Sequence, residues 1–428
     1  MFTIRTRSPG SRARTGTLNL GHGTVQTPAF VPLATRGAVK TLEPRDVEEL
    51  GFEMVLGNTF HLFLAPGHEL VSQLGGLNEF MRWSRPIITD SGGFQVFSMG
   101  YGSVADEIKG RRGSGGSDAI SSGSILAIEE RGVRFRSYLD GGERFIGPET
   151  SMEIQAALGS DIALVFDECT PFHVTRDYTA ASMERTHRWL ARCLAWHERH
   201  GPIDQAVYGI VQGGVEPDLR RISAEVVAAS GCAGIAIGGS LGQSKAQMHE
   251  VVTWSTAELE RAAPERPRHL LGIGEIDDLI AGVEAGIDTF DCAMPTRLGR
   301  HGVALVPAPD ARWRVDLAKA SWRDCTEPIL DGCPCPACAG GFSRAYLHYL
   351  LRARELTGMR LVTLHNLSFI ARLMEDLRAA IDQGRLTEVA AALRRGAAPG
   401  ATRAPDAGPG DARGLGAGAE LGATSCTG

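Results

Sequence analysis

The chain has 428 residues, of which 43% are hydrophobic and 22% charged, a composition typical of a globular protein with one large domain or two ordinary ones. Its net charge of −6 excludes a molecule that is basic over its whole surface, as many nucleic-acid-binding proteins are. The chain has no run of 18 apolar residues and no apolar signal core at its N-terminus, so we expect a cytoplasmic protein that does not enter a membrane.

Short apolar runs alternate with helical patterns over most of the chain. Helical patterns cover, for example, Met183–His200 and Pro217–Ser230. Repeated strand–helix units with buried strands predict a parallel α/β fold. Because there are seven or eight units and no strong G-x-G-x-x-G motif, we expect a (β/α)8 TIM barrel. The expected strands are Phe52–Leu56, Pro86–Thr89, Ile162–Phe166, Ala206–Val211, Ile235–Ile237, Leu270–Ile273 and Thr289–Phe290.

Polar residues and glycines follow these runs. The C-terminal strand ends of a barrel face one pocket, so Asp90, Asp167, Gln212, the Gly238-Gly239 backbone and Asp291 should converge. A single aspartate of this kind could be a helix N-cap, but capping does not explain the whole set. An aspartate and a glutamine together can read an amide edge such as that of guanine. Two further carboxylates permit displacement at a sugar carbon, where one attacks C1′ and the other handles the proton of the leaving base.

Two segments lack any hydrophobic period. Residues 103–123 form a Gly/Ser-rich loop between more regular stretches, and we assign it no role. Residues 396–428 are rich in Ala, Gly and Pro and should form a disordered tail.

Three cysteines and a histidine predict a metal site near the C-terminus. Cys333, Cys335 and Cys338 lie in D-G-C-P-C-P-A-C, and His365 follows in T-L-H-N. Three thiolates and one imidazole form a closed tetrahedral shell, which is how one structural Zn²⁺ per chain would be held. A disulfide or chance clustering is the alternative, and His348 is nearer but lies in a helix pattern. We expect the barrel to span residues 1–390, with a zinc-binding subdomain at 297–375.

With these features in place, the chain resembles bacterial tRNA-guanine transglycosylases, also called queuine tRNA-ribosyltransferases. The likeness covers residues 2 to 390 approximately. It implies a zinc-containing (β/α)8 barrel, usually a homodimer, that acts in queuosine biosynthesis. Such an enzyme replaces guanine at the anticodon wobble position of tRNA with a 7-deazaguanine, expected here to be 7-aminomethyl-7-deazaguanine, through a covalent enzyme–RNA intermediate. The matching motifs are D-S-G-G-F-Q-V-F (90–97), F-D-E-C-T-P (166–171), G-I-V-Q-G-G (209–214), F-D-C-A-M-P-T-R-L-G-R (290–300), S-R-A-Y-L-H (343–348) and T-L-H-N-L (363–367).

The resemblance also implies roles for individual residues. Asp291 would be the nucleophile and Asp90 the general acid and base, while Phe94 would stack on the base. The zinc ligands would be the three cysteines and His365 named above. The base would be bound by Ser91, Gly92, Gly93, Phe94, Asp167, Gln212 and Gly239. The anticodon stem-loop would be bound by Gly272, Ile273, Gly274, Glu275, Ile276, Asp277, Asp278, Thr296, Arg297, Leu298, Gly299 and Arg300.

The chain departs from the common bacterial pattern at two places near the expected substrates. Residues 240–243 read S-L-G-Q where L-A-V-G-E is usual, which leaves the preferred base open. The sequence does not define the tRNA set or the dimer geometry. Glu275 stands where a lysine is usual, which should weaken phosphate binding there. A non-catalytic tRNA-binding partner subunit of the same fold is one alternative, disfavoured by the presence of both Asp90 and Asp291. A metal-dependent barrel hydrolase is another, but the chain has no H-x-H pair at a strand end.

Overall fold

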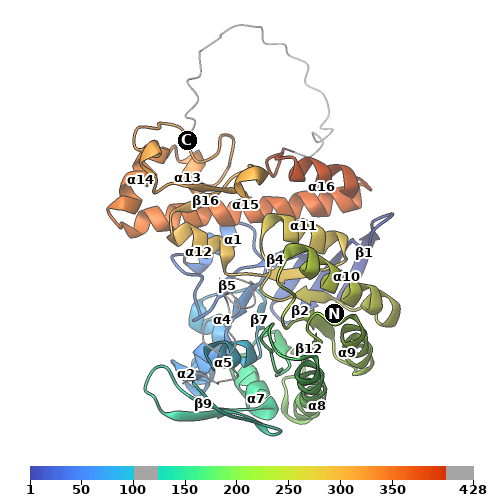
Figure 1. Cartoon of the computed structure of the whole chain (residues 1–428). Helices are drawn as coiled ribbons and strands as arrows, with labels where there is room; N and C mark the ends of the chain where they lie inside the picture. The colour runs from blue at the N-terminus through green and yellow to red at the C-terminus, as the bar shows by residue number, and fades with distance from the viewer. Residues whose placement is uncertain (101–123, 402–428) are drawn as a thin grey trace. The chain divides into compact units, whose positions relative to one another are not determined.

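The computed structural model describes residues 1–100 and 124–401 (Figure 1). The Gly/Ser segment 103–123 and most of the tail predicted at 396–428 lie outside the described residues. The chain divides into two compact units. The first is Met1–Met294 with Ile381–Gly384, and the second is Pro295–Ala380 with the chain from Arg385 onward. The predicted boundaries of the barrel and of the zinc subdomain stay predictions.

The first unit contains a parallel sheet in the order β4-β15-β14-β13-β12-β11-β7-β6-β5. Its two end strands, β4 and β5, are separated in the chain by Pro32 alone, which has no N–H to donate to a ladder. They therefore act as one interrupted strand, and the sheet of the described chain closes into a barrel of eight strands. This confirms the predicted fold class. The strands are β4 (Ala29–Val31), β5 (Leu33–Ala34), β6 (Val55–Gly57), β7 (Ile87–Thr89), β11 (Ile162–Leu164), β12 (Ala206–Val211), β13 (Gly234–Ile237), β14 (Arg268–Leu270) and β15 (Thr289–Asp291).

Helices cover the outside of this barrel. The successive helices α7 to α11 pack against one another in chain order (Figure 1). Two antiparallel sheets accompany the barrel, one of β1 (Phe2–Arg7), β2 (Arg14–Leu20) and β3 (Gly23–Thr27), the other of β8 (Ile125–Glu129), β9 (Gly132–Arg136) and β10 (Glu143–Ile146). The helices are α1 (Pro44–Glu49), α2 (Thr59–Leu64), α3 (His68–Gln73), α4 (Gly76–Met81), α5 (Gly93–Gly100), α7 (Pro148–Leu158), α8 (Arg176–His200), α9 (Pro217–Ala229), α10 (Lys245–Ala262) and α11 (Ile276–Glu284).

Two strands of the barrel differ from the sequence-based prediction. The strand at Ala29–Ala34 was not expected. The strand expected at Leu270–Ile273 lies earlier, at β14, so that prediction was wrong in its position. Its two polar residues, Arg268 and His269, are completely buried, and each is bonded to a neighbouring element, Arg268 to Glu260 and His269 to Thr289. Gly272 then takes a φ of +74°, outside the β region, and the strand cannot continue through it.

The second unit is mainly helical and has its own apolar core. Leu317, Trp322, Ile329, Leu347 and Val362 are buried in this core together with the three predicted zinc cysteines. No helix of the described residues is long and apolar enough to span a membrane. The elements are α12 (Met294–Arg300), which begins at the unit boundary, β16 (Val303–Leu305), β17 (Arg314–Asp316), α13 (Pro336–Ala339), α14 (Arg344–Arg352), α15 (Leu356–Asp382) and α16 (Leu386–Arg394).

Candidate active site and metal centre

Asp90 follows β7 directly and is held by four hydrogen-bond donors. Oδ1 accepts from the backbone N–H of Thr59 at 2.9 Å and of Gly92 at 3.2 Å. Oδ2 accepts from the side-chain amides of Asn58 and Gln95. Burial nevertheless raises the pKa of Asp90 to about 7, with a further contribution from the negative charge of Asp291. A carboxyl group with this pKa can both give and take a proton near neutral pH.

Asp291 ends β15 and is held through one oxygen. Its Oδ1 accepts from Nε2 of His269 at 3.1 Å and from the backbone N–H of Gly272 at 3.0 Å. Among the described residues, Oδ2 has no hydrogen-bond partner. The carboxylate is therefore fixed at one oxygen, and the other is available to react.

Asp167 and Gln212 lie together at the ends of neighbouring strands β11 and β12. Gln212 Nε2 donates to Asp167 Oδ2 at 2.7 Å, and the hydroxyl of Ser91 donates to Oδ1 at 2.9 Å. Burial raises the pKa of Asp167 to about 6. An amide nitrogen carries two hydrogens, so Gln212 keeps one for a ligand while it holds Asp167. The structure thus brings together the two side chains that we expected to read an amide edge.

Two glycines of this region leave no room for a side chain. A Cβ at Gly239 would lie 2.2 Å from Gln212 Oε1, and the residue has a φ of +78°. A Cβ at Gly93 would lie 2.6 Å from the carbonyl oxygen of Asp167. Both distances are shorter than any real Cβ contact, so glycine is required at both positions for the Asp167–Gln212 pair to form as it does.

A buried arginine that the sequence analysis missed supports the loops after β12 and β13. Arg220 is fully buried on α9 and donates to the backbone carbonyls of Val211, Gly214, Gly238 and Ser240. It therefore fixes the backbone on both sides of the Gln212–Gly239 contact. The sequence gives no signal for this role, because an arginine in an amphipathic helix is ordinarily exposed.

The residues that hold the two candidate catalytic acids were not predicted from the sequence either. Asn58 caps α2 by accepting from His61 N–H, and the same side chain donates to Asp90. Gln95 lies in the motif D-S-G-G-F-Q, so its place beside Asp90 could have been inferred from the motif. His269 could not, because it lies at a position where the sequence indicated no strand.

The remaining residues predicted to bind the base or RNA differ in their exposure to solvent. Phe94 is 39% exposed at the start of α5, as a stacking residue would need to be. In the expected RNA segment, Gly272 is exposed, whereas Ile276 and Asp278 are buried in α11. His249 Nε2 binds Asp278 Oδ1 at 3.0 Å. The role of this segment in RNA binding stays a prediction.

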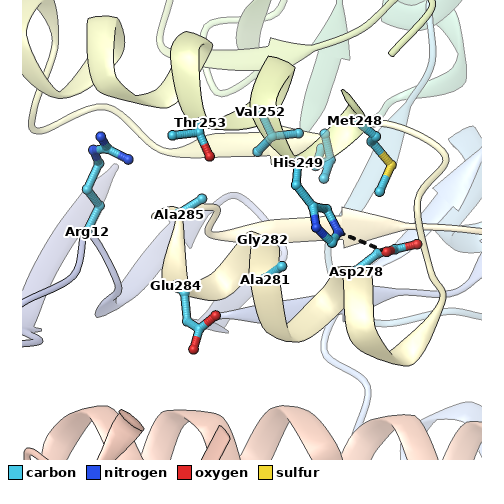
Figure 2. A pocket seen from close by; sticks show the side chains of 11 residues that line it. Arg12, Met248, His249, Val252, Thr253, Asp278, Ala281, Gly282, Glu284 and Ala285 are labelled. Atoms are coloured by element: carbon cyan, nitrogen blue, oxygen red, sulfur yellow. Dashed lines mark hydrogen bonds and ion pairs between the residues drawn. The ribbon is translucent and has the colours of Figure 1, made fainter. Parts of the chain in front are cut away.

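A cavity of about 260 Å³ lies between α10 and α11, next to that pair. Figure 2 shows His249 pointing across it to Asp278, with Arg12 and Glu284 farther along. Its lining contains neither Asp90 nor Asp291, so this cavity is separate from the candidate active site.

In the second unit, α12 carries the other residues expected to bind RNA. Gly299 packs against α15 so closely that a Cβ would lie 2.7 Å from Thr363 Cα. Thr296 is buried, whereas Arg297 is exposed and Arg300 half-exposed. Neither arginine forms an ion pair within the described residues, so both guanidinium groups remain available to an anionic ligand.

The predicted metal ligands form one buried cluster in the second unit. The ligand atoms of Cys333, Cys335, Cys338 and His365 all lie within 4.8 Å of one another. The three sulfurs lie 3.7, 3.4 and 3.4 Å from His365 Nδ1. His365 Nε2 lies 2.8 Å from the carbonyl oxygen of Leu305, which fixes Nε2 as the protonated nitrogen and leaves the lone pair of Nδ1 facing the sulfurs. This cluster could hold a metal ion.

The chain contains a parallel (β/α)8 barrel with two carboxylates at its strand ends that are held in different ways. This arrangement is typical of enzymes that use a pair of carboxylates for displacement at a sugar carbon. Comparison with known proteins identifies the family. The sequence pattern of the family described as queuine tRNA-ribosyltransferase matches residues 9–398. The chain therefore belongs to the queuine tRNA-ribosyltransferase family, as its motifs predicted.

Curated relatives match almost throughout their length, and each of the following is named queuine tRNA-ribosyltransferase. A protein of Roseiflexus sp. (strain RS-1) is 49% identical over 400 residues, covering 91% of this chain and 98% of its own. One from Pelotomaculum thermopropionicum is 44% identical, covering 90% of this chain and 96% of its own. One from Herpetosiphon aurantiacus is 46% identical and covers 90% of each chain.

Proposed function

We propose that this protein is a tRNA-guanine transglycosylase of queuosine biosynthesis. It exchanges guanine at the wobble position of tRNA for a 7-deazaguanine, with 7-aminomethyl-7-deazaguanine as the expected base. Family membership supports the reaction class. The observation that carries the mechanism is the difference between the two carboxylates. Asp90 is half-buried, and desolvation raises its pKa to about 7, while Asp291 keeps one oxygen free.

Asp291 is the nucleophile in this mechanism and Asp90 moves the proton. Asp291 attacks C1′ of the target nucleotide, the C1′–N9 bond breaks, and the proton of Asp90 passes to the departing guanine. The RNA is then held as an ester of Asp291. Asp90, now ionised, takes a proton from the incoming base, whose nitrogen attacks C1′ and releases Asp291. Two displacements retain the sugar configuration and give ping-pong kinetics.

The pair Asp167–Gln212 recognises the base. The carboxylate accepts from N1–H and the 2-amino group of guanine, and the second amide hydrogen of Gln212 goes to O6. The glycine at position 239 keeps the neighbouring backbone close to the plane of the base. Phe94 stacks on the exposed face of the base. A 7-deazaguanine presents the same edge, so one pocket serves both substrates.

The metal of the second unit is one structural Zn²⁺ per chain. The donor set fits this ion, because three thiolates and one imidazole nitrogen complete a tetrahedral shell. When bound, the ion supplies folding energy and no chemistry. The residues 295–366 around it, including α12, are expected to depend on it for their fold.

The RNA partner is the anticodon stem-loop. Arg297 and Arg300 follow the nucleophile by six and nine residues and are not ion-paired within the described chain, so we assign them to RNA phosphates. A homodimer in the cytoplasm is the expected state. None of the eight described cysteines is in a disulfide, which suits a reducing compartment.

The experiment that tests this function is a trapping assay. Wild-type protein incubated with a stem-loop carrying guanosine at the wobble position should give an adduct that survives denaturation, and Asp291→Asn should give none while binding the RNA with similar affinity. Labelled guanine should enter the RNA with wild type alone. A protein that binds the stem-loop without adduct or exchange would be the non-catalytic partner subunit instead.

A further inference from the structure

His269 is a completely buried histidine on the barrel wall, and the mechanism proposed above gives it no part in the reaction. It lies in β14, and its cross-strand neighbour in the parallel register with β15 is Thr289. Asp291 follows Thr289 by two residues on β15, so the three side chains can lie on one face of the sheet, because side chains alternate along a strand.

The alternate residues confirm which face this is. Leu270, next to His269, lines the cavity between α10 and α11 outside the strands. Phe290 packs against Gly282 of α11, where a Cβ would lie 2.5 Å from its ring. Because these two side chains face the helices, His269, Thr289 and Asp291 face the barrel interior.

The hydrogen bonds of His269 run in one direction through the ring. Nε2 lies 3.1 Å from Asp291 Oδ1, and Nδ1 lies 2.8 Å from Thr289 Oγ1. An ionised carboxylate can only accept, so Nε2 must carry a hydrogen for the first bond to form. In the tautomer with its hydrogen on Nε2, Nδ1 is an acceptor, and the Thr289 hydroxyl can donate to it. Thr289 is therefore compatible with the tautomer that binds Asp291 and holds the ring in place.

We propose that His269 is the positioning residue for the nucleophile, and that it selects the attacking atom. Together with Gly272 N–H it holds Asp291 Oδ1, which leaves Oδ2 as the oxygen that bonds to C1′. This proposal rests on the proposed function, in which Asp291 is the nucleophile.

The step balances without any further reactant. Oδ2 supplies the electron pair for the new bond to C1′, the C1′–N9 pair leaves with guanine, and Asp90 supplies the proton. Oδ1 becomes the ester carbonyl and stays within reach of the same two donors. When the new base attacks, the electron pair returns to Oδ2, and His269 and Gly272 stabilise the carboxylate as it re-forms.

The test compares three variants in single-turnover adduct formation with the guanosine stem-loop. His269→Leu should slow the adduct step by about 10–100-fold, since a hydrogen bond to a charged group is lost. His269→Gln places an amide N–H near the position of Nε2 and should stay within about fivefold of wild type. Thr289→Val, which keeps a β-branched strand residue, should slow the step by about 3–10-fold. Stem-loop affinity and the Kd for free guanine should be unchanged in all three.

His22→Leu is the matched control. His22 Nδ1 binds Asp161 Oδ1 at 3.0 Å just before β11, at the opposite end of the strands from Asp291, so its loss should leave the adduct step at the wild-type rate. A wild-type adduct rate in His269→Leu would overturn the proposal. The proposal would also be overturned if His269→Leu and His269→Gln slowed the adduct step equally and both lost guanine binding. That result would mean that His269 acts only by packing. Failure of the proposed function looks different, because wild type itself would then form no adduct.

Discussion

The acid–base assignment of Asp90 makes a quantitative prediction about pH. Desolvation raises the pKa of its carboxyl group from 3.8 to about 7, which is equivalent to about 4 kcal/mol of preference for the neutral acid. At pH 7 about half of the protein then carries the acid needed to protonate guanine. A carboxyl group with the ordinary pKa would supply roughly a thousandth of that amount.

The sign follows from which form acts in each half-reaction. The acid form is present below pH 7 and is lost as pH rises through the pKa, so adduct formation in a single turnover should fall above pH 7, by about tenfold per unit. The assay is quenched-flow measurement of the denaturation-stable RNA adduct between pH 5.5 and 9. Asp90→Asn should abolish this fall in rate above pH 7 and leave a slow rate with no break near pH 7.

A second variant tests the cause of the pKa. Gln95 donates to Asp90 Oδ2 at 3.0 Å and favours the ionised form. Gln95→Leu removes this donor, so the pKa of Asp90 should rise. The pH above which the adduct rate falls should then increase by about 1 pH unit. A profile without a break between pH 6 and 8 in wild type would refute the reasoning. The reasoning would also be refuted if Asp90→Asn kept the fall in rate above pH 7, or if Gln95→Leu moved that fall to lower pH.

Three further predictions concern the base, the metal and the RNA. Asp167→Ala should weaken guanine binding roughly tenfold or more by equilibrium titration, because a buried charge-assisted pair is broken; unchanged affinity would contradict base reading by this residue. Cys335→Ala should lose the metal and unfold the region around residues 320–365; stoichiometric zinc by elemental analysis would disprove the ligand set. Arg297→Ala and Arg300→Ala should raise KM for tRNA more than KM for the free base and should each lower the salt dependence of binding by about one unit of slope; variants that bind tRNA like wild type would place the RNA surface elsewhere.

The sequence by itself determined the features that depend on short spacing along the chain. Cys333, Cys335 and Cys338 lie within six residues, so a single tight segment must bring their sulfurs together, and the structure shows them clustered with His365. The strand-end positions of Asp90, Asp167 and Gln212 were likewise predictable, because each follows an apolar run that a parallel barrel must bury with its C-terminal end at one face.

Only the tertiary structure decided how these residues are held. His269 lies in a strand that begins with two polar residues, and hydrophobic periodicity cannot detect a strand whose buried polar side chains are bonded from other elements. Its bond to Asp291 depends on the register between β14 and β15, which the closure of the barrel sets. The pKa of Asp90 similarly depends on burial produced by the whole barrel. Sequence spacing identifies reactive groups, whereas their ionisation and the choice of attacking oxygen arise from contacts between residues far apart in the chain.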